Sequence, residues 1–285
     1  MPRPTLRSVL RRVAAATVAA TLTVVPVAAQ AVLVAPQGVV LDARARAGSV
    51  ELYNPGERAS EVTLSTVFGH PVSTPEGEIT LRIVESPDSA ANSAAGFIEA
   101  FPRRLVLQPG QRQTVRLLAR PPQGLAAGEY WARLVVAARE AAAPTPDTGA
   151  VDGVRVGLAL EVRTIIAVNY RTGTLRTGVT VDTPTVETTA DSVIVRVPMQ
   201  RTGTAAWIGA TTVRLETADG SAHQEQMLQT AVYTALAPRF AFPRSGLPSG
   251  RFTVRVRASS DRPDVVQATH LRAAPTSIDV PVVLR

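Results

Sequence analysis

Residues 154–171, with the sequence VRVGLALEVRTIIAVNYR, begin with a strict alternation of side-chain character. The apolar half of this two-residue period consists of Val154, Val156, Leu158, Leu160 and Val162. The other half carries only Gly, Ala, Glu and Arg. Because successive side chains of a strand point to opposite faces, the pattern predicts a β-strand with one face buried against another surface.

Similar runs recur along the rest of the chain after residue 31. Short stretches of Val, Leu, Ile and Thr are separated by turns rich in Gly, Pro, Asn and Asp, which is typical of all-β sandwiches. We expect strands in the first half at 32–41, 48–53, 60–68, 78–84, 103–107, 112–119, 129–138 and 154–168. In the second half we expect them at 178–182, 192–199, 210–217, 226–233, 251–258, 264–271 and 277–284.

These strands divide into two sets of similar size. The turn-rich segment 171–178, RTGTLRTG, separates them, and each set has the length of one immunoglobulin-like sandwich. The sequence therefore predicts two such β-sandwich domains in tandem, at 32–171 and 172–285. The Ala- and Pro-rich segment 139–153 has strong strand patterns on both sides. We interpret it as a loop between neighbouring strands, not as a domain linker.

Residues 1–31 have the composition of a secretory signal peptide. Four arginines lie in the first dozen residues, an apolar run extends from Val13 to Ala29, and the segment ends in Ala29-Gln30-Ala31. A basic start, a short apolar run and an Ala-x-Ala site predict export and cleavage after Ala31. The alternative is a membrane anchor, although a run of 17 residues is shorter than the roughly 20 of a typical span. Export and cleavage place the mature protein in the periplasm.

Charge and cysteine content exclude several classes of function. Removing the four arginines of the signal from the 30 in the chain leaves 26 against 23 acidic residues, a net charge of +3. Such a balance, without a cluster of cations, does not indicate nucleic-acid binding. The chain contains no cysteine, which excludes thiol catalysis and thiolate metal sites.

Catalytic and metal-binding motifs are not apparent. His70, His223 and His270 lie far apart and share no ligand spacing with carboxylates, and the chain has no nucleophile elbow, P-loop or dinucleotide-binding glycines. We therefore expect a protein that is not an enzyme and has no metal or cofactor. We expect the aromatic residues Tyr130, Trp131, Phe101 and Trp207 to pack in the core or at strand edges.

Five segments, taken in order, resemble the amino-terminal domain of the PapD-like periplasmic pilus-assembly chaperones. They are VLVAPQGVVL at 32–41, VELYNPGE at 50–57, FPRRLVLQPGQRQTVRLL at 101–118, GEYWARLVV at 128–136 and LALEVRTIIAVNYR at 158–171. Together they cover about residues 32–171, with gaps, and the Pro-Gly-Gln-x-x-x-Val-Arg part is the most specific of them. The second half resembles the family's second domain only loosely.

The resemblance implies a function called donor-strand complementation. A pilus subunit of this system lacks one strand, and the chaperone inserts its own last strand of the first domain into the exposed groove. Here Val156, Leu158, Leu160 and Val162 match the family's donor residues. The implied partners are secreted pilus or other surface-protein subunits and an outer-membrane usher, and no cofactor is implied. From the pattern alone, the same four residues are equally an inward-facing strand face of the protein's own core.

The chain departs from the family at the site that binds the subunit's terminal carboxylate. The family uses an Arg on the first strand and a Lys on the last, and the alignment places Gly38 and Ala167 there. Candidate replacements are Arg44, Arg163 and Arg171, of which Arg171 stands at a family Arg position. These departures keep open an alternative function, a structural or adhesive surface protein built from tandem immunoglobulin-like modules.

Overall fold

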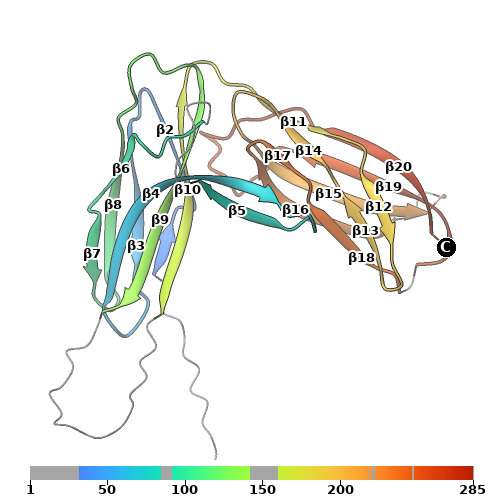
Figure 1. Cartoon of the computed structure of the whole chain (residues 1–285), viewed down its shortest axis with the longest axis horizontal. Helices are drawn as coiled ribbons and strands as arrows, with labels where there is room; N and C mark the ends of the chain where they lie inside the picture. Colours follow the sequence, from blue (N-terminus) through green and yellow to red (C-terminus); the bar gives the residue numbers. More distant parts are fainter. Residues whose placement is uncertain are drawn as a thin grey trace, which may run out of the picture.

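The computed structural model describes residues 32–84, 92–141, 160–217, 219, 222–245 and 247–284. Every regular element in these ranges is a β-strand, and none of the described residues forms a helix that could span a membrane. The predicted all-β fold is therefore confirmed. Two strand bodies lie at an angle to one another, which gives the molecule a bent shape (Figure 1).

The first body is a sandwich of two sheets. One sheet has the order β1-β3-β8-β6 and the other the order β2-β10-β9-β4-β5, with β7 also paired to β4. The first sheet consists of β1 (Leu33–Ala35), β3 (Ala47–Tyr53), β8 (Arg112–Ala119) and β6 (Ile98–Phe101). The second consists of β2 (Gly38–Asp42), β10 (Glu161–Thr172), β9 (Gly128–Glu140), β4 (Ser60–Ser73), β5 (Ile79–Val84) and β7 (Arg104–Leu107).

Alternating side chains of both sheets form the core of this sandwich. On β10 the inward side chains are Ile166, Val168 and Tyr170, which are at most 2% exposed. They pack with residues such as Leu52 of β3 and Leu134 of β9. This is the burial that a period of two predicts for a sheet with one covered face.

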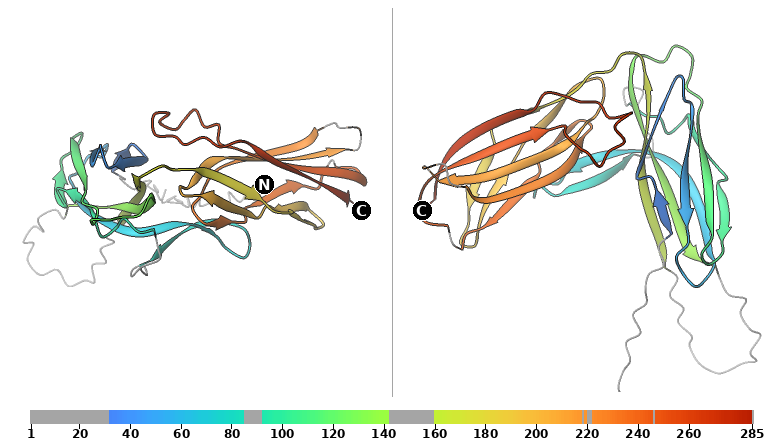
Figure 2. Two further views of the ribbon diagram at one scale, coloured as in Figure 1. Left: turned by 90° about the horizontal axis from the view of Figure 1, so that it is seen from above. Right: turned by 180° about the vertical axis from the view of Figure 1, so that it is seen from behind.

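The second body is also built of layered sheets, and Figure 2 shows it from two further sides. Its sheets have the orders β11-β14-β17, β12-β13-β18 and β16-β15-β19-β20. The strands are β11 (Thr177–Val181), β12 (Thr185–Thr188), β13 (Ser192–Arg196), β14 (Met199–Gly203), β15 (Trp207–Thr217), β16 (Ala222–Val232), β17 (Ala235–Leu236), β18 (Arg239–Pro243), β19 (Gly250–Ser259) and β20 (Thr276–Leu284). Trp207 is 1% exposed in this core, so the prediction that it packs is confirmed.

Several predicted strands need correction. Residues 264–271 form a series of turns instead of a strand, since Val265, Thr269 and His270 each donate a backbone hydrogen bond to the residue three positions earlier. Residues 32–41 are two strands in opposite sheets. Strands β6, β12, β14, β17 and β18 were not predicted, because runs of two to five residues are too short to establish a period.

The predicted loop between neighbouring strands is confirmed for the strands on either side of it. β9 and β10 pair in antiparallel fashion from Glu161–Arg139 to Thr172–Gly128. The two elements flanking the Ala- and Pro-rich segment thus belong to one sheet. The segment itself lies outside the described residues except at its start.

Asn54, at the end of β3, gives a first testable prediction. Its buried side chain donates to the carbonyl oxygens of Arg58 (2.8 Å) and Leu107 (3.0 Å), and its Oδ1 accepts from Gly56 N (3.0 Å). Replacing Asn54 with Ala leaves the buried Leu107 carbonyl without this donor, so we expect a loss of about 2 kcal/mol in the free energy of unfolding. Urea unfolding measures the loss, and an unchanged midpoint would show that water replaces the amide.

Candidate functional site: the free edge of strand β10

Strand β10 is paired along its full length on one side and along only half of it on the other. β9 pairs with it from Glu161 to Thr172, whereas β2 pairs with it, in parallel, only from Ala167 to Arg171. In the described part of the chain, no strand pairs with residues 161–166 on that second side. These residues therefore form an open sheet edge, called here the β10 edge.

The edge is open because the first strand of the domain changes sheets. β1 pairs with β3 in the opposite sheet, and the chain reaches β10 only at Gly38, where β2 begins. Residues 36 and 37 make the crossing between the two sheets. An edge of this kind presents unpaired backbone N–H and C=O groups, which can pair with a strand of another chain.

The inward face of β10 becomes progressively more exposed towards this edge. Ile166 is 1% exposed, Val162 and Thr164 are half-buried, and Leu160, just before the strand, is 52% exposed. The predicted alternation is confirmed here, because these residues continue the face of Val168 and Tyr170. The two other predicted donor residues, Val156 and Leu158, lie outside the described residues. Part of the apolar face thus remains uncovered by the protein's own sheets.

The outward face of the same segment differs in character. Glu161 and Arg163 are exposed and form an ion pair in which Arg163 Nε lies 2.7 Å from Glu161 Oε1. Ile165, on the same face, is 37% exposed. Arg163 is therefore already paired with a neighbour on its own strand, in solvent, where such pairs contribute little.

The positions where the family resemblance implies a carboxylate anchor do lie together. Gly38 of β2 and Ala167 of β10 are register partners in the parallel pair. A Cβ built on Gly38 would make ordinary van der Waals contacts with Ala167, the nearest at 3.8 Å from its backbone O, so a side chain there would not clash. Neither residue carries a charge, and neither can bind a carboxylate by ion pairing.

Arg171, one of the three replacement candidates, is occupied within the protein. Its Nε donates to Glu129 Oε2 at 2.7 Å, and its Nη1 donates to the carbonyl of Thr269 in the second domain. Only 11% of its side chain is exposed. The expectation that Arg171 is available to an incoming carboxylate therefore needs correction: it already binds the carboxylate of Glu129.

Glu129 is the buried centre of the contact between the two domains. Its Oε1 accepts hydrogen bonds from Trp131 Nε1 (3.1 Å) and from the backbone N of Ala206 in the second domain (3.0 Å). The carboxylate is thereby fully satisfied, although the residue is 0% exposed. In the sequence, Glu129 is the acid of the Glu-Tyr pair in GEYWARLVV, one of the segments that carry the family resemblance, but no role at a domain contact was predicted for it.

An aromatic cluster completes the domain interface. Phe68, Trp131 and Tyr233 pack together, with the Trp131 and Tyr233 rings edge to face at a centroid distance of 4.9 Å. Buried Arg133 lies over the Tyr233 ring and donates to Gly69 O and to Tyr233 Oη. The interface thus joins residues of both domains through packed aromatic rings and a cation–π contact.

The hairpin of β4 and β5 also reaches the second domain. Ser73 Oγ accepts from Ala237 N (2.8 Å), Gly77 O accepts from Arg239 N (2.9 Å), and Arg196 Nη1 donates to Pro75 O (2.7 Å). Figure 2 shows this hairpin crossing from one body to the other. Together with the Glu129 contact, it holds the β10 edge at a defined position relative to the second domain.

Arg44, the third candidate, is exposed in the turn after β2. Its backbone N and that of Ala45 both donate to Asp42 Oδ1, at 2.7 and 2.6 Å. The side chain projects from the turn, and no ion pair of Arg44 is found among the described residues. Arg44 is therefore available to an anion, although it lies at the far end of β2 from Gly38.

The turn at Asp42 gives a prediction about pH. The backbone N–H groups of Ala45 and Arg44 lower the pKa of the Asp42 carboxyl. The ionised carboxyl of Asp42 therefore stabilises the folded turn at any pH above its pKa in the unfolded chain. This stabilisation is expected to be lost as the pH falls through its lower pKa in the folded protein. Relative to its intrinsic rate, amide hydrogen exchange of Ala45 is expected to become faster as the pH falls through the folded-state pKa of Asp42. In an Asp42→Asn variant, exchange relative to the intrinsic rate is expected to stay constant with pH.

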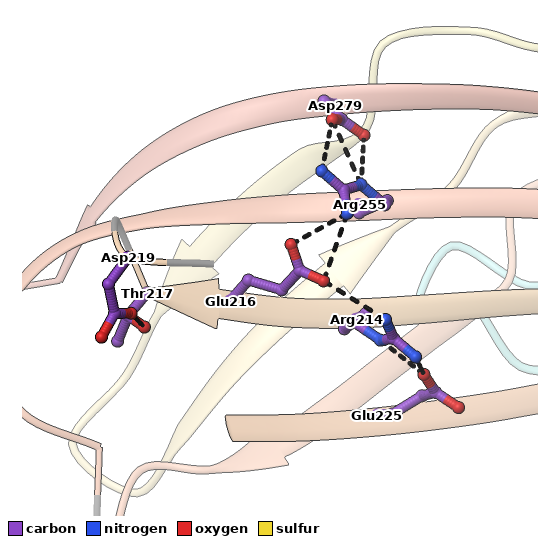
Figure 3. Close-up of polar contacts among 7 residues, drawn as sticks. All are labelled: Arg214, Glu216, Thr217, Asp219, Glu225, Arg255 and Asp279. Atoms are coloured by element: carbon purple, nitrogen blue, oxygen red, sulfur yellow. Dashed lines mark hydrogen bonds and ion pairs between the residues drawn. The ribbon is translucent and has the colours of Figure 1, made fainter. Parts of the chain in front are cut away.

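The densest group of charges lies elsewhere, on the second domain. Glu216 bridges Arg214 and Arg255, which in turn bind Glu225 and Asp279, so that acids and bases alternate across β16, β15, β19 and β20 (Figure 3). Each of the two arginines is shared between two carboxylates. The group holds three carboxylates and two guanidiniums, so it keeps one net negative charge, and its ion pairs connect the four strands of the sheet.

Comparisons with known proteins give similarity only at the level of structure. No family model matches the sequence, and no curated protein matches it. The complex of a chaperone with a tip adhesion subunit from the archaic Csu pili of Acinetobacter baumannii contains a similar chain, with 12% identity, coverage of 87% of this chain and 97% of that one, and a TM-score of 0.44. The Salmonella enterica SafA pilin–SafB chaperone complex also contains a similar chain, with 12% identity, coverage of 88% of this chain and 97% of that one, and a TM-score of 0.40. The periplasmic chaperone SfaE is similar with 12% identity, coverage of 87% of this chain and 98% of that one, and a TM-score of 0.39.

Proposed function

We propose that the protein is a periplasmic chaperone that captures a secreted pilus or other surface-protein subunit by adding strand β10 to it. The observation that carries this proposal is the β10 edge, where an unpaired backbone coincides with a partly uncovered apolar face at Leu160 and Val162. Backbone hydrogen bonds to such an edge give affinity, and alternate side chains entering pockets give fit.

The chemistry of this capture needs no cofactor. The subunit lacks a strand, so its groove is lined by apolar side chains that water would otherwise contact. Inserting Leu160 and Val162 removes apolar surface from water on both partners, and full burial of each side chain is worth about 2 kcal/mol. Later completion of the subunit's own fold, at an outer-membrane usher, supplies the free energy for release without a nucleotide.

The domain interface supports the proposal in a second way. Glu129, the aromatic cluster and the β4–β5 hairpin hold the two sandwiches together, so that a subunit bound at β10 lies against a preformed surface. A preorganised surface loses less conformational entropy on binding than a mobile one does.

Co-purification of exported proteins tests the proposal. The tagged full chain, expressed in its own host and exported, is expected to recover one-to-one complexes with proteins that are degraded in its absence. Hydrogen exchange of the segment around residues 161–166 is expected to slow in the complex, because the edge amides gain partners. The exported chaperone is expected to begin at Val32, as the signal-peptide prediction requires.

The alternative of a structural or adhesive surface protein predicts different results. It is favoured by the uncharged Gly38 and Ala167, which replace the charged pair that the family resemblance implies. A protein of that class would be recovered alone, at the cell surface, with unchanged exchange at the β10 edge. Recovery of the free monomer only, under conditions where surface proteins are being exported, would contradict the chaperone proposal.

A further inference from the structure

Two of the aromatic residues that were expected to pack have opposite environments. Phe101, at the end of β6, is 74% exposed, so the expectation is wrong for this residue. Its neighbour Ala100 takes the inward position of the strand and is 5% exposed, which leaves Phe101 on the outer face. Trp131 is 3% exposed and does pack, at the contact between the two domains, where its ring lies beside that of His70.

His70 belongs to the part of β4 that extends from the first domain towards the second (Figure 1). Up to Val67 this strand pairs with β9, and from Phe68 onwards it pairs with β5. The centroid of the His70 ring lies 5.8 Å from that of Phe68 and 6.2 Å from that of Trp131. Since both of those rings pack with Tyr233 of the second domain, His70 takes part in the contact between the domains.

The charged side chains that the structure shows around this ring are cations. Arg82 of β5 is the register partner of His70, and Arg133 of β9, which is 5% exposed, supplies a second positive charge. From the second domain, Arg201 lies over the Trp131 ring at 5.6 Å from its centroid. No ion pair of these three arginines is found in the described part of the chain.

The carboxylate of this interface, Glu129, is already bound to other groups. It accepts hydrogen bonds from Arg171, Trp131 and Ala206, and a protonated His70 would have to compete with them. Two guanidinium nitrogens at the interface, Nη2 of Arg133 and Nε of Arg201, are buried without a hydrogen-bond partner. The interface therefore has more buried donors than acceptors to receive them.

These surroundings favour the neutral form of His70. Burial of the ring lowers its pKa below the ordinary value of 6.5, and repulsion from Arg82 and Arg133 lowers the pKa further. The Nδ1 atom is buried and has no hydrogen-bond partner. Since both nitrogens of a charged imidazole are donors, protonation adds a positive charge beside two arginines and leaves Nδ1–H without an acceptor.

We propose that His70 makes the contact between the two domains sensitive to pH, so that acid loosens this contact. The neutral ring packs against Phe68 and Trp131, whereas the charged ring brings an uncompensated charge into the aromatic cluster. The contact is expected to have its full strength above pH 6.5, and to weaken as the pH falls from there towards the lower pKa of the folded protein. The inference goes beyond the proposed chaperone function and does not depend on it.

Hydrogen exchange of amides that cross the interface tests this proposal on the full chain, without a subunit. Ala206 N donates to Glu129 Oε1 and Ala237 N donates to Ser73 Oγ, so the protection of both amides reports the closed contact. Between about pH 8 and about pH 5, where histidine titrates, this protection is measured relative to the intrinsic exchange rate. It is expected to fall about tenfold, as it does when the closed contact binds the proton about ten times more weakly than the open one.

Two variants and one control identify the titrating group. His70→Gln, which stays neutral at every pH, is expected to remove the pH dependence. Arg82→Glu changes an exposed residue and is expected to reduce the dependence, because a carboxylate replaces a cation beside the ring. The matched control, His270→Gln in the second domain, is expected to retain it. Circular dichroism checks that the variants are folded, and Arg82→Glu decides if His70→Gln is not.

The proposal is overturned if the protection of Ala206 in the wild-type chain is constant over this pH range. It is equally overturned if His70→Gln or Arg82→Glu keeps the full wild-type dependence, or if His270→Gln removes it. In each of these cases, the ring of His70 does not control the contact between the domains.

Discussion

Glutamate at both Leu160 and Val162 is expected to abolish subunit capture and to leave the protein folded. Leu160 is 52% exposed and Val162 half-buried, so the change leaves the domain core intact. In the complex, the same positions enter an apolar groove, where two carboxylates lose their hydration without gaining a partner. Losing two buried apolar side chains alone predicts at least about a 100-fold weaker complex.

Co-purification and hydrogen exchange of the β10 segment measure this effect. The control is Ile165→Glu, which adds one of these two carboxylates to the same segment but on its outward face, at a residue that is 37% exposed. It is expected to retain capture. Equal loss of capture in both variants would indicate general electrostatic repulsion, and unfolding of the Leu160 and Val162 double variant would show that this face belongs to the core.

Replacing Glu129 with Ala is expected to lower the free energy of unfolding by about 4 kcal/mol. The change leaves the mostly buried Arg171 guanidinium without its carboxylate, and a buried charge that loses its partner costs about 3–5 kcal/mol. Trp131 Nε1 and Ala206 N lose an acceptor at the same time. Because these contacts join the two domains, we also expect the variant to unfold in two transitions and the wild-type protein in one.

Urea unfolding followed by tryptophan fluorescence and circular dichroism measures both effects, since Trp131 lies at the interface and Trp207 in the second core. The control removes an exposed ion pair of the neighbouring strand β10, by Arg163→Ala, and is expected to cost less than about 1 kcal/mol. A Glu129→Ala variant no less stable than this control would show that the interface is held by the aromatic cluster and the hairpin alone.

The sequence predicted the elements whose pattern is long. The alternation was visible in the letters from Val154 to Val162, and in β10 the structure shows the even-numbered face buried at Ile166, Val168 and Tyr170. Prediction failed where the pattern was short or ambiguous. Residues 264–271 contain β-formers, yet Arg262 binds Asp264 and successive turns replace the strand.

The candidate site was predictable only in part. Leu160 and Val162 were identified from alternation and from the family resemblance, and the structure places both beside an open edge. Arg171 was a candidate carboxylate anchor, and no pattern in the sequence shows that Glu129, 42 residues away, lies next to it. Phe101 was expected to pack, because a hydrophobic residue at a strand end has no periodic neighbour that would reveal its outward position.

The sequence by itself determined local properties. These are the alternation of side chains along the strands, the turns that end the strands, the basic segment and apolar run at residues 1–31, and the absence of cysteine. These follow from side-chain alternation and turn chemistry, which act between residues close in the chain. The tertiary structure decided which strand edge stays open, which charges are satisfied and which aromatic ring faces solvent. Such properties depend on residues that folding brings together from distant parts of the chain. Two examples are the end of β1 at Ala35, after which the chain changes sheets, and the contacts of Glu129 with Arg171 and Ala206.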